Sequence, residues 1–528
     1  MSINSFVENK FNLVEEPWIP AAGMGRISLR QAFSDREVIA LGGNPIQKLA
    51  VTKLLLAIAQ AAYTPLDSAA LDALCADEFS ERCLDYLDRW KDRFWLYGER
   101  PFLQMPAIEG LIEKRRQGEL KEATSKSTQR KAEDNAKPKP IGLGYYPDMP
   151  AENNTIISHY EVMRDVDDAD SALFVLMLMN FAFGGKHCEK RIDFLIPDST
   201  IRQKQALWAP SIGRYGYLHS HLTGPILVDT IMLNLLSHEQ IHANDYWVTG
   251  LGIAPWEKMP TGENCEIAQA LMNSYMSTLL SLARFVLLKG GRIYYLEGIR
   301  YDETGSEWRE PGIAVNYSSS KKKVVWADPN KRPWREIVSM LSFIDSEIKY
   351  DSQFISYGLP RARNKYDIIG IWSGGLCVSW NAGNQFVKQN NDFVESNFSF
   401  QTRLLKKKWY QHLKIEMIAM EKLSEKIFSA TKAFYESFQP MQKSMSKDRQ
   451  ATRIASQASM LYWQLCERNF QALIIACEEM DKLPAIRSLI AQNAMKSFEA
   501  YCPKDTSRQL EAWAKCKPNL FNYLNPKA

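Results

Sequence analysis

The chain has 528 residues, of which 45% are hydrophobic and 24% are charged, and its formal net charge is +4. This length exceeds what one hydrophobic core usually supports, so two or more domains are expected. No apolar run is long enough for a membrane span and no N-terminal signal pattern is present, so we expect a cytoplasmic protein that does not contact a membrane.

The cysteine pattern argues against a stapled or zinc-stabilised domain. The nine cysteines include no C-x-x-C pair, so neither a zinc knuckle nor a disulfide framework is indicated. We interpret them as free thiols, most of them buried, and we expect no metal ion and no cofactor.

Positive charge is concentrated toward the C-terminus. Residues 401–528 contain 21 Lys and Arg against 12 Asp and Glu, which leaves 44 against 49 for residues 1–400. Such asymmetry indicates a polyanion or an acidic partner for the C-terminal part. A basic helical surface without any such partner is equally common.

The first 140 residues predict a hairpin, two helices and a loop. Two short extended segments around a glycine turn within Phe11–Ala32 are typical of a hairpin. Apolar spacing predicts amphipathic helices over Pro45–Tyr63 and Leu71–Phe94. Residues 113–140 are polar and basic, so we expect a mobile or partner-ordered loop there.

The stretch Ser171–Arg191 organises the middle of the chain. Ala172–Phe183 is apolar on almost every face and predicts a buried helix, which breaks at Gly184 and Gly185 into a basic segment. The two glycines could offer bare backbone N–H groups to a polyanion. The alternative is a helix C-cap followed by a solvated turn.

Three further segments follow before the C-terminal region. Gly224–Leu236 predicts a helix, and Ala268–Leu288 a long helix that passes through two glycines into a strand at Arg292–Leu296. Ile368–Trp380 reads as two short apolar strands around Ser373, Gly374 and Gly375, which indicates a hairpin.

The last part of the chain contains no glycine after about residue 390. Proline-containing breaks separate the helical patterns, which predicts a bundle with short connections. The patterned segments are Leu404–Phe438, Arg449–Met480, Leu483–Tyr501 and Ser507–Cys516.

Taken in order, these segments resemble the large subunit (CasA) of the type I-E CRISPR Cascade surveillance complex. The resemblance extends over nearly the whole chain and implies an α+β fold. A large mixed α/β domain of family-specific topology would occupy residues 1–390, and a four-helix bundle residues 391–528. The matching segments are Leu13–Pro20, Arg100–Gln104, the apolar helix into Phe183–Gly185, Gly224–Leu236, the Gly-Gly hairpin and the C-terminal helices.

The resemblance also implies a function without catalysis. In that family the large subunit recognises the protospacer-adjacent motif (PAM) in double-stranded DNA, starts strand separation, and helps to hold the displaced strand. The implied partners are a guide RNA (crRNA), the other Cascade subunits, the target duplex, and a nuclease that is either recruited or fused to another subunit.

Ala182, Gly184 and Gly185, with the adjacent Lys186, match the family's glycine loop, which contacts the PAM in the minor groove. Backbone donors suit that groove, where the base-pair patterns are degenerate. The family's minor-groove lysine has no clear counterpart. Candidates for it are Arg292, Arg300 and the run Lys321–Lys323, for which a solvated charge run is the alternative.

Trp372, Ser373, Gly374, Gly375 and Leu376 fall where the family carries its wedge hairpin. The polar Asn-Gln type of tip is replaced here, so Leu376 or Trp372 would have to unstack the bases. An ordinary type I′ hairpin without a DNA role is the alternative.

A loop facing the guide RNA or a neighbouring subunit is expected at Asn153, Asn154, Ile156, Ile157 and His159, which match the family loosely.

Two functions of other classes remain open. His238-Glu-Gln-Ile-His242 matches the H-E-x-x-H pattern of zinc metalloproteases and could continue the preceding helix, although no third ligand is evident nearby. A helical scaffold protein without a nucleic-acid role is the other alternative. No phosphate-binding G-x-x-x-x-G-K-[ST] motif occurs, which argues against an ATPase.

Overall fold

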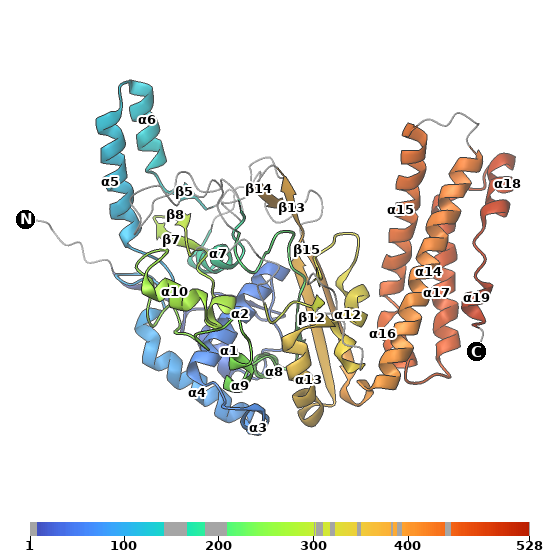
Figure 1. Ribbon diagram of the computed structural model, residues 1–528, viewed down its shortest axis with the longest axis horizontal. Helices are drawn as coiled ribbons and strands as arrows, with labels where there is room; N and C mark the ends of the chain where they lie inside the picture. The colour runs from blue at the N-terminus through green and yellow to red at the C-terminus, as the bar shows by residue number, and fades with distance from the viewer. Residues whose placement is uncertain are drawn as a thin grey trace, which may run out of the picture. The chain divides into compact units, whose positions relative to one another are not determined.

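The computed structural model describes residues 8–141, 166–184, 208–299, 301, 310–316, 323–345, 350–381, 384–387, 393–438 and 445–526. The chain forms two units (Figure 1). Unit 1 comprises Met1–Pro333 and Tyr350–Asn397, and unit 2 comprises Trp334–Lys349 and Phe398–Ala528. Unit 1 mixes helices with small sheets and the C-terminal part is helical, so the predicted α+β class is confirmed.

The N-terminal segment forms the predicted hairpin. β2 (Ile19–Ala21) pairs antiparallel with β3 (Gly25–Ile27). The preceding strand β1 (Lys10–Asn12) pairs instead with β4 (Trp95–Tyr97), which lies more than 80 residues later. A capping box at Ser28 then starts α1 (Leu29–Ser34).

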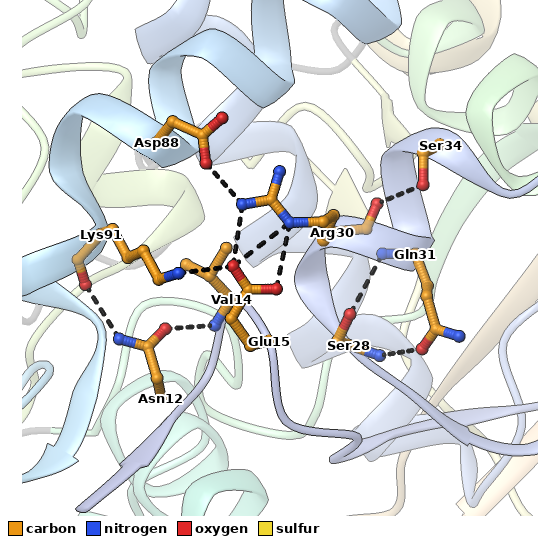
Figure 2. A network of polar contacts seen from close by, with 9 residues as sticks. All are labelled: Asn12, Val14, Glu15, Ser28, Arg30, Gln31, Ser34, Asp88 and Lys91. Atoms are coloured by element: carbon orange, nitrogen blue, oxygen red, sulfur yellow. Dashed lines mark hydrogen bonds and ion pairs between the residues drawn. The ribbon is translucent and has the colours of Figure 1, made fainter.

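An ion-pair network fastens this segment to two helices (Figure 2). Glu15 accepts hydrogen bonds from Arg30 at 2.9 Å and from Lys91 at 2.7 Å, and Arg30 also pairs with Asp88. Asn12 Nδ2 donates to the carbonyl of Lys91 at 3.1 Å. The hydrogen bond from Arg30, and after it the one from Lys91, lowers the pKa of Glu15 to about 2.

Helix α2 (Pro45–Ala62) forms the centre of unit 1. It begins where the side chain of Asn44 caps the backbone N–H groups of Ile46 and Gln47, with Pro45 at the first helical position. The predicted helix is confirmed, but it is not amphipathic, because fourteen of its eighteen residues are buried. It contacts α4 (Ala76–Trp90), α7 (Asp168–Asn180), α8 (Leu227–Leu233), α11 (Met276–Leu279) and β12 (Ile368–Leu376).

A buried ion pair lies on this helix. Lys53 Nζ is 2.6 Å from Glu310 Oε2, 2.8 Å from Ser211 Oγ and 2.7 Å from the carbonyl of Thr278. The side chains of Lys53 and Glu310 are 1% and 0% exposed. Burial lowers the pKa of Lys53 and raises the pKa of Glu310, and each charge opposes the shift of the other.

Three sequence predictions for unit 1 are wrong in detail. The helix expected over Leu71–Phe94 is interrupted at Leu74 and Cys75, between α3 (Ser68–Ala73) and α4. The long helix expected over Ala268–Leu288 is replaced by two short helices and strand β7 (Arg284–Lys289). Strand β7 pairs with β8 (Arg292–Glu297), so the predicted strand after the glycines is confirmed.

The third error concerns residues 113–140, which are not a loop. They belong to α5 (Ala107–Glu122), α6 (Lys126–Asn135) and β5 (Lys139–Pro140), and the two helices lie side by side (Figure 1). Arg115 pairs with Glu119, and Arg116 pairs with Glu113, along one helix. Such pairs at i,i+3 and i,i+4 stabilise a helix that buries few apolar side chains.

The sheets of unit 1 are small. Strand β12 lies between β15 (Phe393–Gln401) and β6 (His219–Thr223), and β8 lies between β5 and β7. A third sheet contains β10 (Lys323–Val324), β9 (Val315–Asn316) and β11 (Tyr350–Asp351) in that order. The other helices are η1 (Lys91–Arg93), α9 (His238–His242), α10 (Glu266–Met272) and α13 (Gln353–Lys365).

Unit 2 is helical apart from the end of β15. Its longest helix, α14 (Lys407–Phe438), packs against α15 (Met445–Glu467), α17 (Leu483–Tyr501) and α18 (Ser507–Cys516). The pattern predicted over Arg449–Met480 is broken after Glu467. The shorter helices are η3 (Pro333–Glu336), α12 (Ile337–Met340), η4 (Ser342–Ile344), η5 (Thr402–Leu404), α16 (Phe470–Ala476) and α19 (Phe521–Leu524).

The first segment of unit 2, which begins at Trp334 and is separated in sequence from the rest of the unit, contributes to the core of unit 2. Trp334 is 1% exposed, and its ring centroid is 4.6 Å from that of Phe470 and 5.6 Å from that of Trp463. The bundle itself is therefore built from two separate stretches of chain. The number of helices in the bundle and the boundary at residues 390 and 391 stay predictions.

Within the described ranges, no helix combines the length and the apolar character that crossing a bilayer requires.

Candidate nucleic-acid interface

Helix α7 leads to the predicted glycine loop. The side chain of Asp167 caps the helix by accepting from the N–H of Asp170 at 2.7 Å, and the residues from Ser171 to Asn180 are all buried. The predicted buried helix is confirmed, although it ends at Asn180 rather than Phe183. Of the four residues predicted for the loop, Ala182 and Gly184 are described, whereas Gly185 and Lys186 lie outside the described residues.

The backbone of Gly184 is already hydrogen-bonded. Its N–H donates to Gln385 Oε1 at 2.9 Å, and its carbonyl accepts from the N–H of Gln385 at 2.8 Å. Ala182 is 0% exposed, and its carbonyl accepts from the N–H of Ala209 at 2.8 Å. The prediction that Gly184 presents a bare N–H group is therefore wrong.

The side chain of Gln385 connects Gly184 to a turn at residues 213–216 by hydrogen bonds. Its Nε2 donates to the carbonyl of Gly213 at 2.6 Å and to that of Arg214 at 2.9 Å, and the residue is fully buried. We call Gly184, Gly213, Arg214 and Gln385 the Gln385 cluster. It joins the end of α7, the turn at residues 213–216 and strand β14 (Asn384–Val387), which are far apart in sequence.

The hairpin predicted around Ser373–Gly375 does not exist. Trp372, Ser373, Gly374, Gly375 and Leu376 lie inside the continuous strand β12, which pairs with β6 from Gly370 opposite Thr223 to Gly374 opposite His219. All five are buried. None of them can act as a wedge, because a wedge has to project into solvent.

The two glycines have a packing role in this strand. A Cβ on Gly375 would lie 2.4 Å from the carbonyl oxygen of Tyr217, and one on Gly374 would lie 2.7 Å from the ring of Trp372. Glycine in a strand interior often marks such a close approach of another backbone. The Gly-Gly pair therefore lets β12 lie directly against the chain at residues 216 and 217.

The sheet around β12 holds two buried histidines. The ring of His221 stacks on that of Trp372, with centroids 4.8 Å apart, and Trp372 Nε1 donates to Glu395 Oε1 at 2.5 Å. Burial lowers the pKa of His221 to about 3 and, together with the charge of Lys53, lowers the pKa of His219 well below its usual value. Both imidazoles are therefore neutral near pH 7.

A hairpin does occur a few residues later. Strand β13 (Val378–Asn381) pairs antiparallel with β14, with Asn381 opposite Asn384. The sequence signal was present: Asn-Ala-Gly-Asn stands between two short segments in which apolar and polar residues alternate. Asn384-Gln385 is a polar pair of the type expected from the resemblance for the wedge, but the side chain of Gln385 is fully buried, so it is not itself a wedge tip.

The remaining predicted residues are only partly placed. Arg292 and Lys323 are exposed, whereas Arg300, Lys321 and Lys322 lie outside the described residues. The predicted guide-RNA or subunit-facing loop is outside them as well, and it comprises Asn153, Asn154, Ile156, Ile157 and His159.

The H-E-x-x-H match lies on a short separate helix. Helix α9 begins after the cap residue Ser237, and α8 has ended at Leu233, so the segment does not continue the earlier helix, as the sequence would have allowed. The rings of His238 and His242 are 6.3 Å apart. In the part of the chain that the structure describes, no group of three His, Cys, Asp or Glu side chains is placed to hold a metal ion.

Comparison of the whole fold defines the class of protein first. The structure is similar to a crystal structure of CasA from Thermus thermophilus, with a TM-score of 0.69, 19% identity, and coverage of 98% of this chain and 100% of that chain. It is similar to the CRISPR-associated protein Cse1 from Acidimicrobium ferrooxidans, with a TM-score of 0.65, 15% identity and coverage of 98% of both chains. A chain of a structure described as a CRISPR RNA-guided surveillance complex gives a TM-score of 0.63, 14% identity, and coverage of 97% of this chain and 99% of that chain. The fold is that of the CasA and Cse1 proteins.

The sequence then assigns the family. The family model for the CRISPR-associated protein Cse1 matches residues 12–502, and the chain belongs to that family. The resemblance to CasA drawn from the sequence is thereby confirmed. Among the curated proteins, none matches the chain by sequence.

Proposed function

We propose that this chain is the large subunit of a type I-E-like Cascade complex and that it recognises the PAM of double-stranded target DNA. Membership of the Cse1 family supports the subunit assignment. The similar chain in an RNA-guided surveillance complex supports a guide RNA and further Cascade subunits as partners. The subunit has no catalysis of its own, and a separate nuclease cuts the target.

The observation that carries the PAM assignment is the Gln385 cluster. Two of its four hydrogen bonds hold Gly184, in the predicted glycine loop, against β14, and the other two hold the turn at residues 213–216 against the same strand. A minor-groove reader needs backbone groups of fixed position, because the groove offers few distinguishing contacts to flexible side chains. A wedge that opens the adjacent base pairs has to sit beside that reader. The cluster supports this proposal because it joins the predicted glycine loop to the hairpin.

We assign the wedge to the β13–β14 hairpin in place of Trp372–Leu376. The glycine-loop role then belongs to the segment that begins at Gly184 and includes Gly185 and Lys186. Opening of the first base pairs lets the guide RNA pair with the target strand, while the displaced strand is held by the subunit.

The test compares Gln385→Leu with Gln60→Leu in the reconstituted complex. Gln385→Leu keeps the size of the side chain and removes its three hydrogen bonds. Gln60 on α2 is a matched control outside the cluster and the hairpin, because its buried side chain also makes three hydrogen bonds, to Thr64 and to the backbone of Leu236. Binding is measured on duplexes that carry the PAM or a scrambled PAM, and strand opening by permanganate reactivity of the first pairs.

We expect Gln385→Leu to lose most of the difference in affinity between the two duplexes while the complex still assembles, and Gln60→Leu to discriminate between them like the unchanged protein. Full PAM discrimination by an assembled Gln385→Leu complex would contradict the assignment. A complex that binds both duplexes equally without any substitution would contradict the proposed function itself.

A further inference from the structure

Two exposed side chains stand at the tip of a turn closed by glycines. Arg214 and Tyr215 lie between Gly213, with φ of +59°, and Gly216, with φ of +84°. A Cβ on Gly216 would lie 2.0 Å from the carbonyl oxygen of Leu376, so no other residue fits there without moving the chain. The sequence Gly-Arg-Tyr-Gly thus fixes which two side chains face solvent.

The turn is held from three sides. Gln385 Nε2 binds the carbonyls of Gly213 and Arg214, the N–H of Tyr217 donates to the carbonyl of Ile212 at 3.0 Å, and the N–H of Ala327 donates to the carbonyl of Gly216 at 2.8 Å. A ligand that binds here does not have to order the backbone first, which lowers the entropic cost of binding.

Tyr215 is the outermost ring of an aromatic group. It is 43% exposed and lies edge-to-face with Trp326, with centroids 5.6 Å apart. Trp326 stacks in turn on Tyr217 at 4.9 Å and an interplanar angle of 13°, and Tyr217 is buried. The exposed phenol ring is therefore backed by a half-buried indole that itself stacks on a buried ring.

Arg214 adds a positive charge to this group. Its guanidinium carbon is 5.5 Å from the centroid of Tyr215 and 5.8 Å from that of Trp380, which lies on the β13–β14 hairpin. Within the described ranges, no carboxylate forms an ion pair with Arg214. The charge is thus available to an anionic ligand, and it lies between the turn and the hairpin.

We propose that Tyr215, backed by Trp326, is a stacking site for one unpaired base of a DNA strand, and that Arg214 binds the phosphate next to that base. Aromatic rings beside an arginine are the usual means by which proteins hold single strands, because every base has a face that can stack. The site rests on the proposed function for its place in the reaction. Opening of the duplex at the hairpin supplies an unpaired base next to Trp380.

The experiment uses the full chain and a fluorescent twelve-nucleotide oligo(dT), with fluorescence anisotropy at several salt concentrations. The variants are Tyr215→Ala, Tyr215→Phe and Arg214→Gln. Matched controls in unit 2 are Phe521→Ala, which removes an exposed aromatic side chain, and Arg508→Gln, which removes an exposed charge.

We expect Tyr215→Ala to weaken oligonucleotide binding about tenfold, with the slope of log affinity against log salt unchanged, because stacking involves no counterion release. Tyr215→Phe should retain the affinity. Arg214→Gln should reduce that slope by about 0.7, the value for one phosphate contact on a single strand. Neither control should change the affinity or the slope.

Equal affinities of oligo(dT) for the unchanged chain, Tyr215→Ala and Phe521→Ala would overturn the stacking site. Binding of PAM duplexes by the same variants in the complex is measured in parallel. If the complex with the unsubstituted chain binds PAM and scrambled-PAM duplexes equally, the proposed function is wrong. A selective loss of oligo(dT) binding in Tyr215→Ala supports the stacking site whether or not the complex discriminates the PAM.

Discussion

Breaking the buried ion pair of Lys53 and Glu310 from either side should destabilise unit 1, with opposite dependences on pH. Removing one partner of a buried pair costs about 3–5 kcal/mol, because the other charge is left without compensation. Lys53→Met should lie at the upper end of this range, since Glu310 Oε1 has no hydrogen-bond partner among the described residues. Glu310→Gln should lie at the lower end, since Lys53 Nζ keeps Ser211 Oγ and the carbonyl of Thr278 as acceptors.

The signs of the pH dependence follow from burial. In Lys53→Met the pKa of Glu310 is raised, so stability is greatest at low pH and falls as the pH rises above the unfolded value of 4.5. In Glu310→Gln the pKa of Lys53 is lowered, so stability recovers as the pH rises toward the unfolded value of 10.5. Each slope is at most about 1.4 kcal/mol per pH unit for one proton.

The assay is urea unfolding monitored by peptide-resolved hydrogen exchange. This readout reports the unfolding of α2 in unit 1 separately from that of α17 in unit 2, which serves as an internal control. The double variant Lys53→Met with Glu310→Gln should cost less than either single change, because two neutral groups replace the pair. Single losses below about 1 kcal/mol that add up in the double variant, with no dependence on pH, would refute the reasoning about this pair.

Three further outcomes are expected. Leu376→Ala should lower the stability of unit 1 by about 2–5 kcal/mol in urea unfolding, because the side chain is 2% exposed. It should weaken the binding of intact and pre-opened DNA targets to the same extent. A selective loss of binding to the intact duplex would instead support a wedge role for this residue. Gly375→Ala should destabilise β12, because the added Cβ would lie 2.4 Å from the Tyr217 carbonyl oxygen. The measurement is hydrogen exchange, which should be faster for the amides of β6 and β12. Unchanged exchange would show that the backbone at Tyr217 shifts without cost to accommodate the methyl group. The pKa of Glu15 is lowered, so its contribution to the free energy of unfolding is present above pH 4.5 and lost toward pH 2. The contribution should be below about 1 kcal/mol, because solvent screens the ion pairs. Glu15→Gln should abolish that part of the pH dependence of unfolding, and an identical pH profile in the variant would contradict the contribution.

Sequence reasoning placed those elements whose signals are local. Helix α2 was found because its apolar residues recur at helical spacing, and α17 and α18 because proline-containing breaks separate them. The run Leu279–Leu288 was taken for a helix because it is apolar at nearly every position, so that period two and period 3.6 cannot be distinguished.

The errors at the candidate interface have a different cause. Gly374 and Gly375 were interpreted as a turn because nothing near them in sequence shows that Tyr217 lies against them. Gln385 was missed because its partners, Gly184 and Gly213, are 201 and 172 residues away. Local patterns carry no record of such distant contacts, and the hairpin signal at Asn381–Asn384 was overlooked beside a more conspicuous pair of glycines.

The way in which the chain divides between the units has a consequence for dissecting the protein. The polypeptide passes from one unit to the other at three places, after Pro333, after Lys349 and after Asn397. No single cut can release either unit intact. A fragment that stops at residue 390 would carry Trp334 without Phe470 and Trp463, while a fragment that starts there would have a hole in its core where the indole belongs. On the ribosome, residues 334–345 leave the exit tunnel well before the helices they pack against, so the helical unit can be completed only after its later helices have been synthesised.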